Sequence, residues 1–199
     1  MKSRGIIRVT SIISASSNRP SFLKQSLIKQ GMNIILTGFM GSGKTEVGKR
    51  LAERLGYTFI DTDLLIEKKT GKSISDIFGK DGEPFFRDTE TEILKELSGT
   101  NEHVISTGGG IVTREENILH LRKIGYIIWL RASPETILRR VGNETHRPLL
   151  NVGNPIEQIK MLMSQREQFY SRADLTIDTD GLEVDEIVDV IISKIEDSR

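Results

Sequence analysis

Residues Ile35–Leu51 read ILTGFMGSGKTEVGKRL, and this stretch decides the fold. Its centre, GFMGSGKT over Gly38–Thr45, matches the pattern G-x-x-x-x-G-K-[ST] in full. Glycines let the backbone N–H groups wrap around phosphates, and a helix beginning near Lys44 would add its unpaired N–H groups and positive dipole end. The stretch therefore predicts a nucleotide-binding loop, with Lys44 on the β- and γ-phosphates and the Thr45 hydroxyl on Mg²⁺.

A glycine-rich turn with a surface lysine is the alternative interpretation of this loop. Against it, an apolar run precedes the loop, and an amphipathic pattern follows until Gly56, a typical helix-ending residue. Further apolar runs alternate with helical patterns along the chain, which predicts a parallel α/β sheet with right-handed crossovers. The expected strands are Asn33–Thr37, Thr58–Asp61, His103–Ser106, Tyr126–Leu130 and Asp174–Ile177.

Helix-start patterns mark two of the expected helices. Ser133 followed by Pro134 reads as an N-cap with proline at the first helical position. Asn154 and Pro155 repeat that pattern, with Glu157 three residues after the cap, as in a capping box.

Bulk composition limits the function. The 199 residues contain no cysteine, which excludes disulfides, thiolate catalysis and Cys-ligated zinc and fits a cytoplasmic location. No apolar run approaches the roughly 18–20 residues that span a bilayer, so we expect no membrane association. We also expect no nucleic-acid binding, because residues 32–199 hold 22 basic against 28 acidic residues, a net charge of −6.

Residues 1–31 differ from the rest of the chain: they hold six basic residues and no Asp or Glu. We favour an upstream extension created by an early start codon, with Met32 as the start of the working domain. A transit peptide, which would give an organellar location, is a second interpretation, since such peptides are poor in acids and rich in Ser and Arg. A poorly ordered tail of unknown role is a third. We therefore expect a poorly ordered extension over 1–31 and one domain over 32–199.

Two carboxylates follow the second expected strand, in FIDTDLLIE. Asp61 and Asp63 stand at a carboxyl end of the sheet, where open α/β folds bind ligands. In extended chain, residues two apart point to the same side, so both could face one crevice. One would serve Mg²⁺ and the other an acceptor hydroxyl; the alternative is that either one only caps the next helix.

A glycine triplet and three arginines complete the candidate set. Gly108–Gly110 follows the third expected strand and either approaches a ligand or makes a bare turn. Arg87, Arg147 and Arg166 carry guanidinium forks that suit carboxylates and phosphates, although most arginines are solvated surface residues.

Six motifs taken together resemble the shikimate kinase family. They are GFMGSGKT, DTDLLIE, FFRDTE, STGGG, RPLL and REQFYSRAD, which occur in the order and near the spacing of that family from Met32 to near the C-terminus. The resemblance implies transfer of a phosphoryl group from ATP, with Mg²⁺, to the 3-hydroxyl of shikimate in aromatic amino acid biosynthesis. It also implies a P-loop kinase fold, a three-layer sandwich around a five-stranded parallel sheet, and a monomeric enzyme.

The resemblance assigns roles to single residues. On the nucleotide side it implies contacts by Gly41, Ser42, Gly43, Lys44, Thr45, Glu46, Arg140 and Arg147, with Arg140 stacked on the adenine and Arg147 moving onto the transferred phosphate. On the acceptor side it implies Asp63, Arg87, Gly109, Gly110 and Arg166, with Asp63 at the hydroxyl and the two arginines at the carboxylate. It implies Thr45 and Asp61 for Mg²⁺, and Asp63, Lys44 and Arg147 for catalysis. Phe78 and Phe86 would line the acceptor pocket, and Glu90 would orient the arginines.

The resemblance further implies a substrate-binding segment over about 62–92 and a lid over about 142–153. One departure concerns the segment IDTDGLEVDEI, which lacks the proline that contacts adenine in some family members. Two other functions stay open on the same scaffold: a kinase for another hydroxy acid such as gluconate, and a non-catalytic nucleotide-binding module.

Overall fold

The computed structural model describes residues 31–141 and 154–196, and five parallel strands form its centre. The strands are β1 (Asn33–Thr37), β2 (Thr58–Asp61), β3 (His103–Ser106), β4 (Gly125–Arg131) and β5 (Leu175–Asp178). Their order in the sheet is β2-β3-β1-β4-β5, so the expected parallel sheet and all five strands are confirmed.

Two of the five strands have bounds that differ from the expectation. The fourth strand extends one residue further at each end, to Gly125 and Arg131. The fifth strand begins at Leu175 instead of Asp174 and ends at Asp178 instead of Ile177. Asp174 precedes it, and its side-chain Oδ2 accepts a hydrogen bond from the backbone N–H of Ile127, at 2.9 Å.

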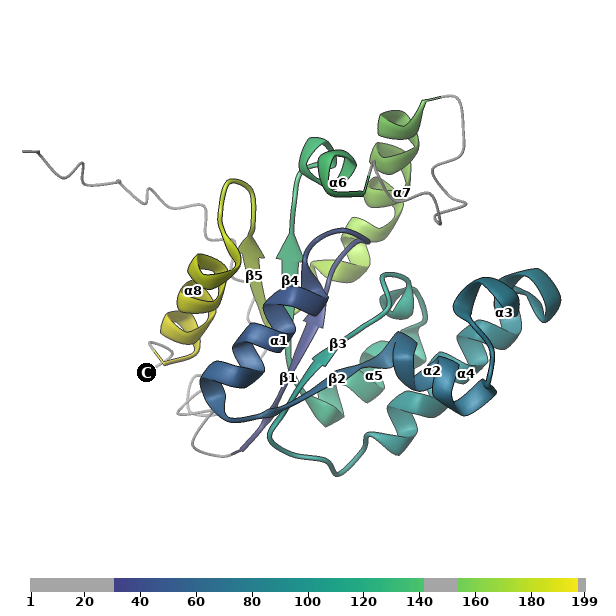
Figure 1. Cartoon of the computed structure of the whole chain (residues 1–199), viewed down its shortest axis with the longest axis horizontal. Coiled ribbons are helices and arrows are strands. Elements are labelled where there is room, and N and C mark those ends of the chain that lie inside the picture. Colours follow the sequence, from purple (N-terminus) through teal and green to yellow (C-terminus); the bar gives the residue numbers. More distant parts are fainter. Residues whose placement is uncertain (1–30, 142–153, 197–199) are drawn as a thin grey trace, which may run out of the picture.

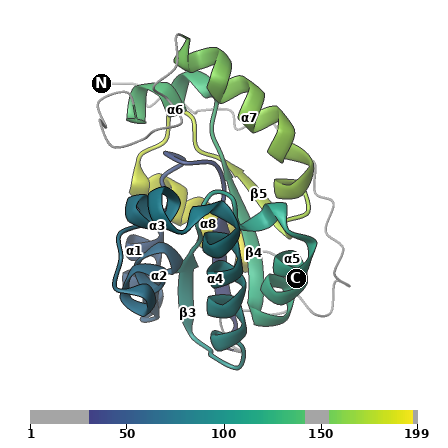
Figure 2. The same ribbon diagram turned by 90° about the vertical axis from the view of Figure 1, so that its right-hand side faces the viewer.

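Side chains along each strand alternate between two apolar layers. Ile34 and Leu36 pack against α1 (Lys44–Leu55) and α8 (Val184–Glu196), whereas Ile35 faces the opposite layer. That opposite layer contains α4 (Gly82–Glu96) and α5 (Glu115–Ile124), which lie in front of the strands in Figure 2. Helices therefore cover both faces, which confirms the three-layer sandwich and explains why the strands read as apolar throughout.

The remaining helices surround the carboxyl ends of the strands (Figure 1). They are α2 (Thr62–Thr70), α3 (Ile74–Lys80), the 3₁₀ turn η2 (Ile111–Thr113), α6 (Pro134–Val141) and α7 (Pro155–Tyr170). The first two, with α4, make up the expected substrate-binding segment. The expected lid lies outside the described residues, as do residues 1–30. No helix within the described ranges is long and apolar enough to span a bilayer.

The caps match the sequence in part. Gly56 ends α1 in a left-handed conformation, and the Ser133 hydroxyl accepts from the N–H of Thr136 at 3.2 Å, as expected. Asn154 is the N-cap residue of α7 and Pro155 its first helical residue, as expected, but the Asn154 side chain makes no capping hydrogen bond. Pro155 supplies the fixed φ of a first helical residue without that bond.

Asn33 joins three segments at the amino end of the sheet. Its fully buried amide nitrogen donates to the carbonyl oxygens of Thr100 and Ile124, at 2.7 and 3.2 Å. Its Oδ1 accepts from the N–H of His103 at 3.0 Å, which fixes the start of β3 against the central strand.

Removal of the Asn33 amide should destabilise the fold. Asn33→Ala leaves buried backbone groups without partners, and we expect the free energy of unfolding to fall by roughly 2–4 kcal/mol. Urea denaturation measures this loss. The matched control is Asn101→Ala, an exposed asparagine in the same region, which should change stability by less than about 0.5 kcal/mol. Equal stabilities for the two variants would contradict the joining role.

Candidate active site

The phosphate-binding loop connects β1 to α1 at the carboxyl end of the sheet. Gly38, Gly41 and Gly43 have φ angles of 146°, 72° and 95°, which favour glycine, and a Cβ at Gly38 would lie 2.5 Å from the carbonyl oxygen of Leu130. The Lys44 ammonium donates to the carbonyl oxygens of Gly38 and Phe39, at 2.9 and 3.0 Å, and so lies against the loop. The expected loop-to-helix geometry is confirmed.

A cavity of about 360 Å³ opens beside this loop and collects many of the predicted residues. It is lined by Met40, Gly41, Gly43, Lys44, Thr45, Glu46, Asp61, Asp63, Ser106, Thr107, Gly109 and Arg140. These residues come from the loops after β1 and β3, the end of β2, the starts of α1 and α2, and α6. The fold thus brings the nucleotide loop together with Asp63 and Gly109 of the expected acceptor residues, whereas Arg87, Gly110 and Arg166 do not line this cavity.

Other predicted nucleotide contacts lie around the loop. Ser42 is buried, and within the described residues its hydroxyl has no hydrogen-bond partner. Arg140 donates to the carbonyl oxygens of Gly41 and Thr179, each at 3.4 Å, and thus joins the loop to the segment after β5. Arg147 falls outside the described part of the chain.

Asp61 caps α2, which was one of the interpretations made from the sequence, and it also contacts Thr45. One carboxylate oxygen caps α2 by accepting from the N–H of Asp63 at 3.0 Å, and the other accepts from the Thr45 hydroxyl at 3.1 Å. The expectation of an extended pair is wrong, because Asp63 lies in the first turn of α2 and not in a strand. The two carboxylates line the same cavity because the helix begins between them.

Asp63 and Glu90 form an acidic pair in which Glu90 is buried and Asp63 is partly buried. Within the described residues, Asp63 Oδ1 and Glu90 Oε1 have no hydrogen-bond partner. Burial, followed by the charge of Asp61, raises the pKa of Asp63 to about 6. Burial likewise raises the pKa of Glu90 to about 7, although the nearby Arg87 charge opposes this. Both groups therefore change protonation near neutral pH, as groups at functional sites often do.

The glycine triplet after β3 meets a different neighbour at each position. A Cβ at Gly108 would lie 2.7 Å from Asp63 Oδ1 and 3.0 Å from Glu90 Oε1. A Cβ at Gly109 would meet the phosphate-binding loop, and one at Gly110 would collide with the Arg87 guanidinium. The triplet is therefore a close-packed junction and not a bare turn. Gly108 was not among the predicted contacts, although the triplet itself indicated it.

Arg87 lies on α4 with its side chain 13% exposed. It donates to Glu90 Oε2 at 2.7 Å and to Glu83 Oε1 at 2.9 Å, and its guanidinium lies 5.1 Å from the Phe86 ring centre. The resemblance implied that Glu90 orients the arginines, and the structure places Glu90 directly on Arg87. Phe86 is buried, but Phe78 is 42% exposed, although their ring centres lie 4.8 Å apart.

Arg166 reaches the same loop from α7. Its guanidinium donates to the carbonyl oxygen of Gly109 at 3.4 Å and lies 5.7 Å from the centre of the Phe39 ring. The Tyr170 hydroxyl donates to the same Gly109 oxygen. Phe39 and Tyr170 were missed as individual site residues. Tyr170 had a readable signal, because a residue four positions after Arg166 lies on the same helical face.

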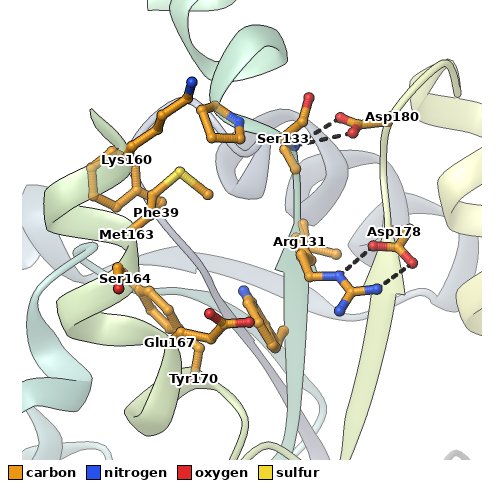
Figure 3. A pocket seen from close by; sticks show the side chains of 14 residues that line it. Phe39, Arg131, Ser133, Lys160, Met163, Ser164, Glu167, Tyr170, Asp178 and Asp180 are labelled. Carbon is orange, nitrogen blue, oxygen red and sulfur yellow. Dashed lines mark hydrogen bonds and ion pairs between the residues drawn. The ribbon is translucent and has the colours of Figure 1, made fainter. Parts of the chain in front are cut away.

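A second cavity, of about 390 Å³, lies behind α7 (Figure 3). Phe39, Tyr170 and Glu167 lie on one side of it, while Arg131 and Asp178, joined at 2.5 Å, lie on the other. This cavity touches the active site only through its aromatic wall, because Phe39 and Tyr170 also contact Arg166 and Gly109.

Comparison with known proteins agrees with this geometry. The family model for shikimate kinase matches residues 40–196. The shikimate kinase of Thermodesulfovibrio yellowstonii is 50% identical over 164 residues, covering 82% of this chain and 95% of that protein. That of Caldanaerobacter subterraneus subsp. tengcongensis is 48% identical over 160 residues, covering 80% and 94%.

A solved structure gives the same result. A shikimate kinase from Acinetobacter baumannii in complex with shikimate matches with a TM-score of 0.79 and 39% identity, over 88% of this chain and 97% of that one. The site gathers a phosphate-binding loop, an acidic pair and two arginines around one glycine triplet. Relatives of this identity cover four fifths of the chain, and the family model matches most of it, so the chain belongs to the shikimate kinase family.

Proposed function

We propose that this protein transfers the γ-phosphoryl group of ATP to the 3-hydroxyl of shikimate. The observation that carries the proposal is the glycine triplet, which places the phosphate-binding loop, the Asp63–Glu90 pair and Arg87 around three consecutive residues. A phosphoryl donor and a small carboxylic acid acceptor would meet at this junction. Phosphoryl transfer needs positioning and charge neutralisation more than covalent help, and these residues supply both.

The nucleotide side would hold the phosphates through the backbone of the loop. Gly41, Ser42 and Gly43 precede α1 and would offer N–H groups to the phosphates, with that of Ser42 first leaving the carbonyl oxygen of Phe39, to which it donates at 3.1 Å. Lys44 would likewise leave its carbonyl partners to neutralise the β- and γ-phosphates. Glu46 lies at the cavity edge with a largely exposed side chain. Arg140 is placed beside the loop where an adenine could stack on its guanidinium plane.

The acceptor side would be held at both ends. Arg87 and Arg166 would bind the carboxylate through their forks, while the backbone of Gly109 and Gly110 would contact the acceptor between them. Asp63 lines the cavity, where its carboxylate would hold the 3-hydroxyl in line with the γ-phosphate and accept its proton. Glu90 would keep Arg87 in place through their 2.7 Å contact.

Thr45 and Asp61 suit Mg²⁺. Both are oxygen ligands, and they already lie 3.1 Å apart. Within the described residues no cluster of three or more His, Cys, Asp or Glu could hold a metal, which fits an ion bound by one or two protein oxygens together with phosphates and water. When bound, Mg²⁺ supplies positive charge that neutralises the transferring phosphoryl group.

Two alternative functions share this scaffold. A gluconate kinase would also need a phosphate-binding loop and a base, but the paired arginines with DTD and the glycine triplet favour shikimate. A non-catalytic module would need neither Asp63 nor Lys44, yet both line the cavity. We further propose that 142–153 forms a lid carrying Arg147 onto the phosphate, so that closure excludes water as an acceptor.

The acceptor is tested by an ADP-release assay across a panel of hydroxy acids. We expect shikimate to give the highest kcat/KM, because its carboxylate and hydroxyls match the two arginines and Asp63. Gluconate and quinate serve as the competing acceptors. A preference for gluconate, or no ADP release with shikimate, would overturn the proposed acceptor.

Asp63→Asn tests the base. We expect kcat to fall by at least about 100-fold, the lower range for a general base, while the dissociation constant of ATP changes by less than about twofold. Steady-state kinetics and calorimetric titration of ATP measure the two quantities. Asp88→Asn, which alters an exposed carboxylate on α4, is the control and should keep normal turnover. Near-normal turnover in Asp63→Asn would remove Asp63 from the mechanism.

We propose a cytoplasmic monomer in which residues 1–30 carry no catalytic group. The boundary is set at Gly31, because its carbonyl oxygen accepts from the N–H of Glu102 at 2.7 Å and belongs to the fold. Deletion of residues 1–30 should leave kcat and both KM values within about twofold of the full chain. Light scattering should give monomers for both proteins. A stable dimer, or a loss of thermal stability on deletion, would contradict this part of the proposal.

A further inference from the structure

Helix α7 carries Arg166 but has few anchors. Of its sixteen residues, the buried ones are Ile159 in the first half and Tyr170 at the end. The cavity of about 390 Å³ lies along the helix between Lys160 and Tyr170, so close packing does not fix this side of the helix (Figure 3). Arg166 precedes Tyr170 by one helical turn, and its position therefore depends on how Tyr170 is held.

Tyr170 is held by an aromatic contact with β4 and by polar contacts of its hydroxyl with Gly109 and Arg166. Its ring stacks on Trp129 of β4, with ring centres 5.7 Å apart and planes 19° apart. Its hydroxyl donates to the carbonyl oxygen of Gly109. Burial raises the pKa of Tyr170 to about 12, so the hydroxyl keeps its proton and remains a donor at neutral pH.

The Gly109 carbonyl has two candidate donors, and they are not equivalent. The Tyr170 hydroxyl makes the close contact, whereas Arg166 Nη1 lies at 3.4 Å, near the limit of a hydrogen bond. The guanidinium instead lies 5.7 Å from the centre of the Phe39 ring, within the range of a cation–π contact. Because this partly buried carbonyl would lose its close donor, loss of the phenol would draw Arg166 toward Gly109.

We propose that Tyr170 is a positioning residue for the acceptor: its hydroxyl satisfies the Gly109 carbonyl and thereby leaves the Arg166 guanidinium available for the acceptor carboxylate. This inference rests on the proposed function in so far as the acceptor is a carboxylic acid. Tyr170 does not line the cavity beside the nucleotide loop and reaches it through the Gly109 carbonyl, so its effect should fall on the acceptor side.

Tyr170→Phe tests the inference, because it removes only the hydroxyl and keeps the ring on Trp129. We expect the KM for shikimate to rise about tenfold, the KM for ATP to stay within twofold, and kcat to change by less than threefold. Such a pattern means that ground state and transition state lose the same interaction. With shikimate methyl ester, which lacks the carboxylate charge, the variant and the wild type should have equal KM values.

Tyr126→Phe is the matched control. Tyr126 is also buried, and its hydroxyl also donates to a backbone carbonyl, that of Asp174 at 3.5 Å, but its ring packs in the layer formed by α1 and α8. This variant should leave the KM for shikimate unchanged. Urea denaturation of both variants separates a loss of stability from a loss of acceptor binding.

The double variant Tyr170→Phe/Arg166→Lys tests whether Tyr170 and Arg166 act on the KM for shikimate together or independently. If Tyr170 acts through Arg166, its removal should raise the KM for shikimate by less than twofold once Arg166 has been replaced. An unchanged KM for shikimate in Tyr170→Phe, an equal rise in the KM for ATP, or additive effects in the double variant would overturn the inference.

The ratio of the KM of Tyr170→Phe to that of the wild type can be measured with whichever hydroxy acid the enzyme prefers. Failure of the proposed function would appear in the wild-type protein, as a lack of ADP release with shikimate. The ratio of variant to wild type is then measured with the hydroxy acid that the wild type accepts. If the wild type turns over none, calorimetric titration of shikimate into both proteins measures the same ratio, and equal dissociation constants overturn the inference.

Discussion

The active end of this molecule depends on close backbone packing between the loop after β1 and the loop after β3. The two strands are neighbours in parallel register, with Leu36 opposite Ser106, so both loops leave the same edge of the sheet. A Cβ at Gly109 would lie only 3.3 Å from the backbone nitrogen of Met40 and 3.4 Å from the carbonyl oxygen of Gly38. Because neither loop carries side chains at this contact, donor phosphates and acceptor can be brought together.

That packing brings two carboxylates, Asp63 and Glu90, and the guanidinium of Arg87 into a small volume. The carboxylates of Asp63 and Glu90 lie beside Gly108, and burial penalises their charged forms, which is why their pKa values rise to about 6 and about 7. Arg87 offsets part of the penalty through Glu90. A protein whose residues 32–199 carry a net charge of −6 can still bind two anions, because a few arginines, a lysine and backbone N–H groups act locally where the site is partly shielded from water.

The proposed acceptor side is built from two helices that differ in how many of their side chains are buried. Arg87 lies on α4, whose buried residues pack along most of its length, and its guanidinium has two carboxylate partners. Arg166 lies on α7, which has two buried side chains and a cavity behind it. The first arginine is held by ion pairs and packing. The second arginine is held by its contact with the Phe39 ring and by the Gly109 carbonyl, which it shares with Tyr170. Its position therefore depends on the loop after β1, the loop after β3 and the end of α7.

The sequence by itself determined the features that are local. The phosphate-binding loop, the five strands and the parallel α/β arrangement follow from contiguous patterns, because glycine conformations, helix dipoles and apolar periodicity act over a few residues. Pairing Arg87 with Arg166 required the family resemblance, since 79 positions separate them and nothing in either segment refers to the other.

Only the tertiary structure decided which groups meet. It placed Asp63 in a helix although its spacing from Asp61 suggested a strand, and it assigned each glycine of the triplet its own neighbour. It also brought Tyr170 to the Gly109 carbonyl, a contact between residues 61 positions apart. Such contacts arise from the sheet order and from how the helices pack on it, which local residue patterns do not encode.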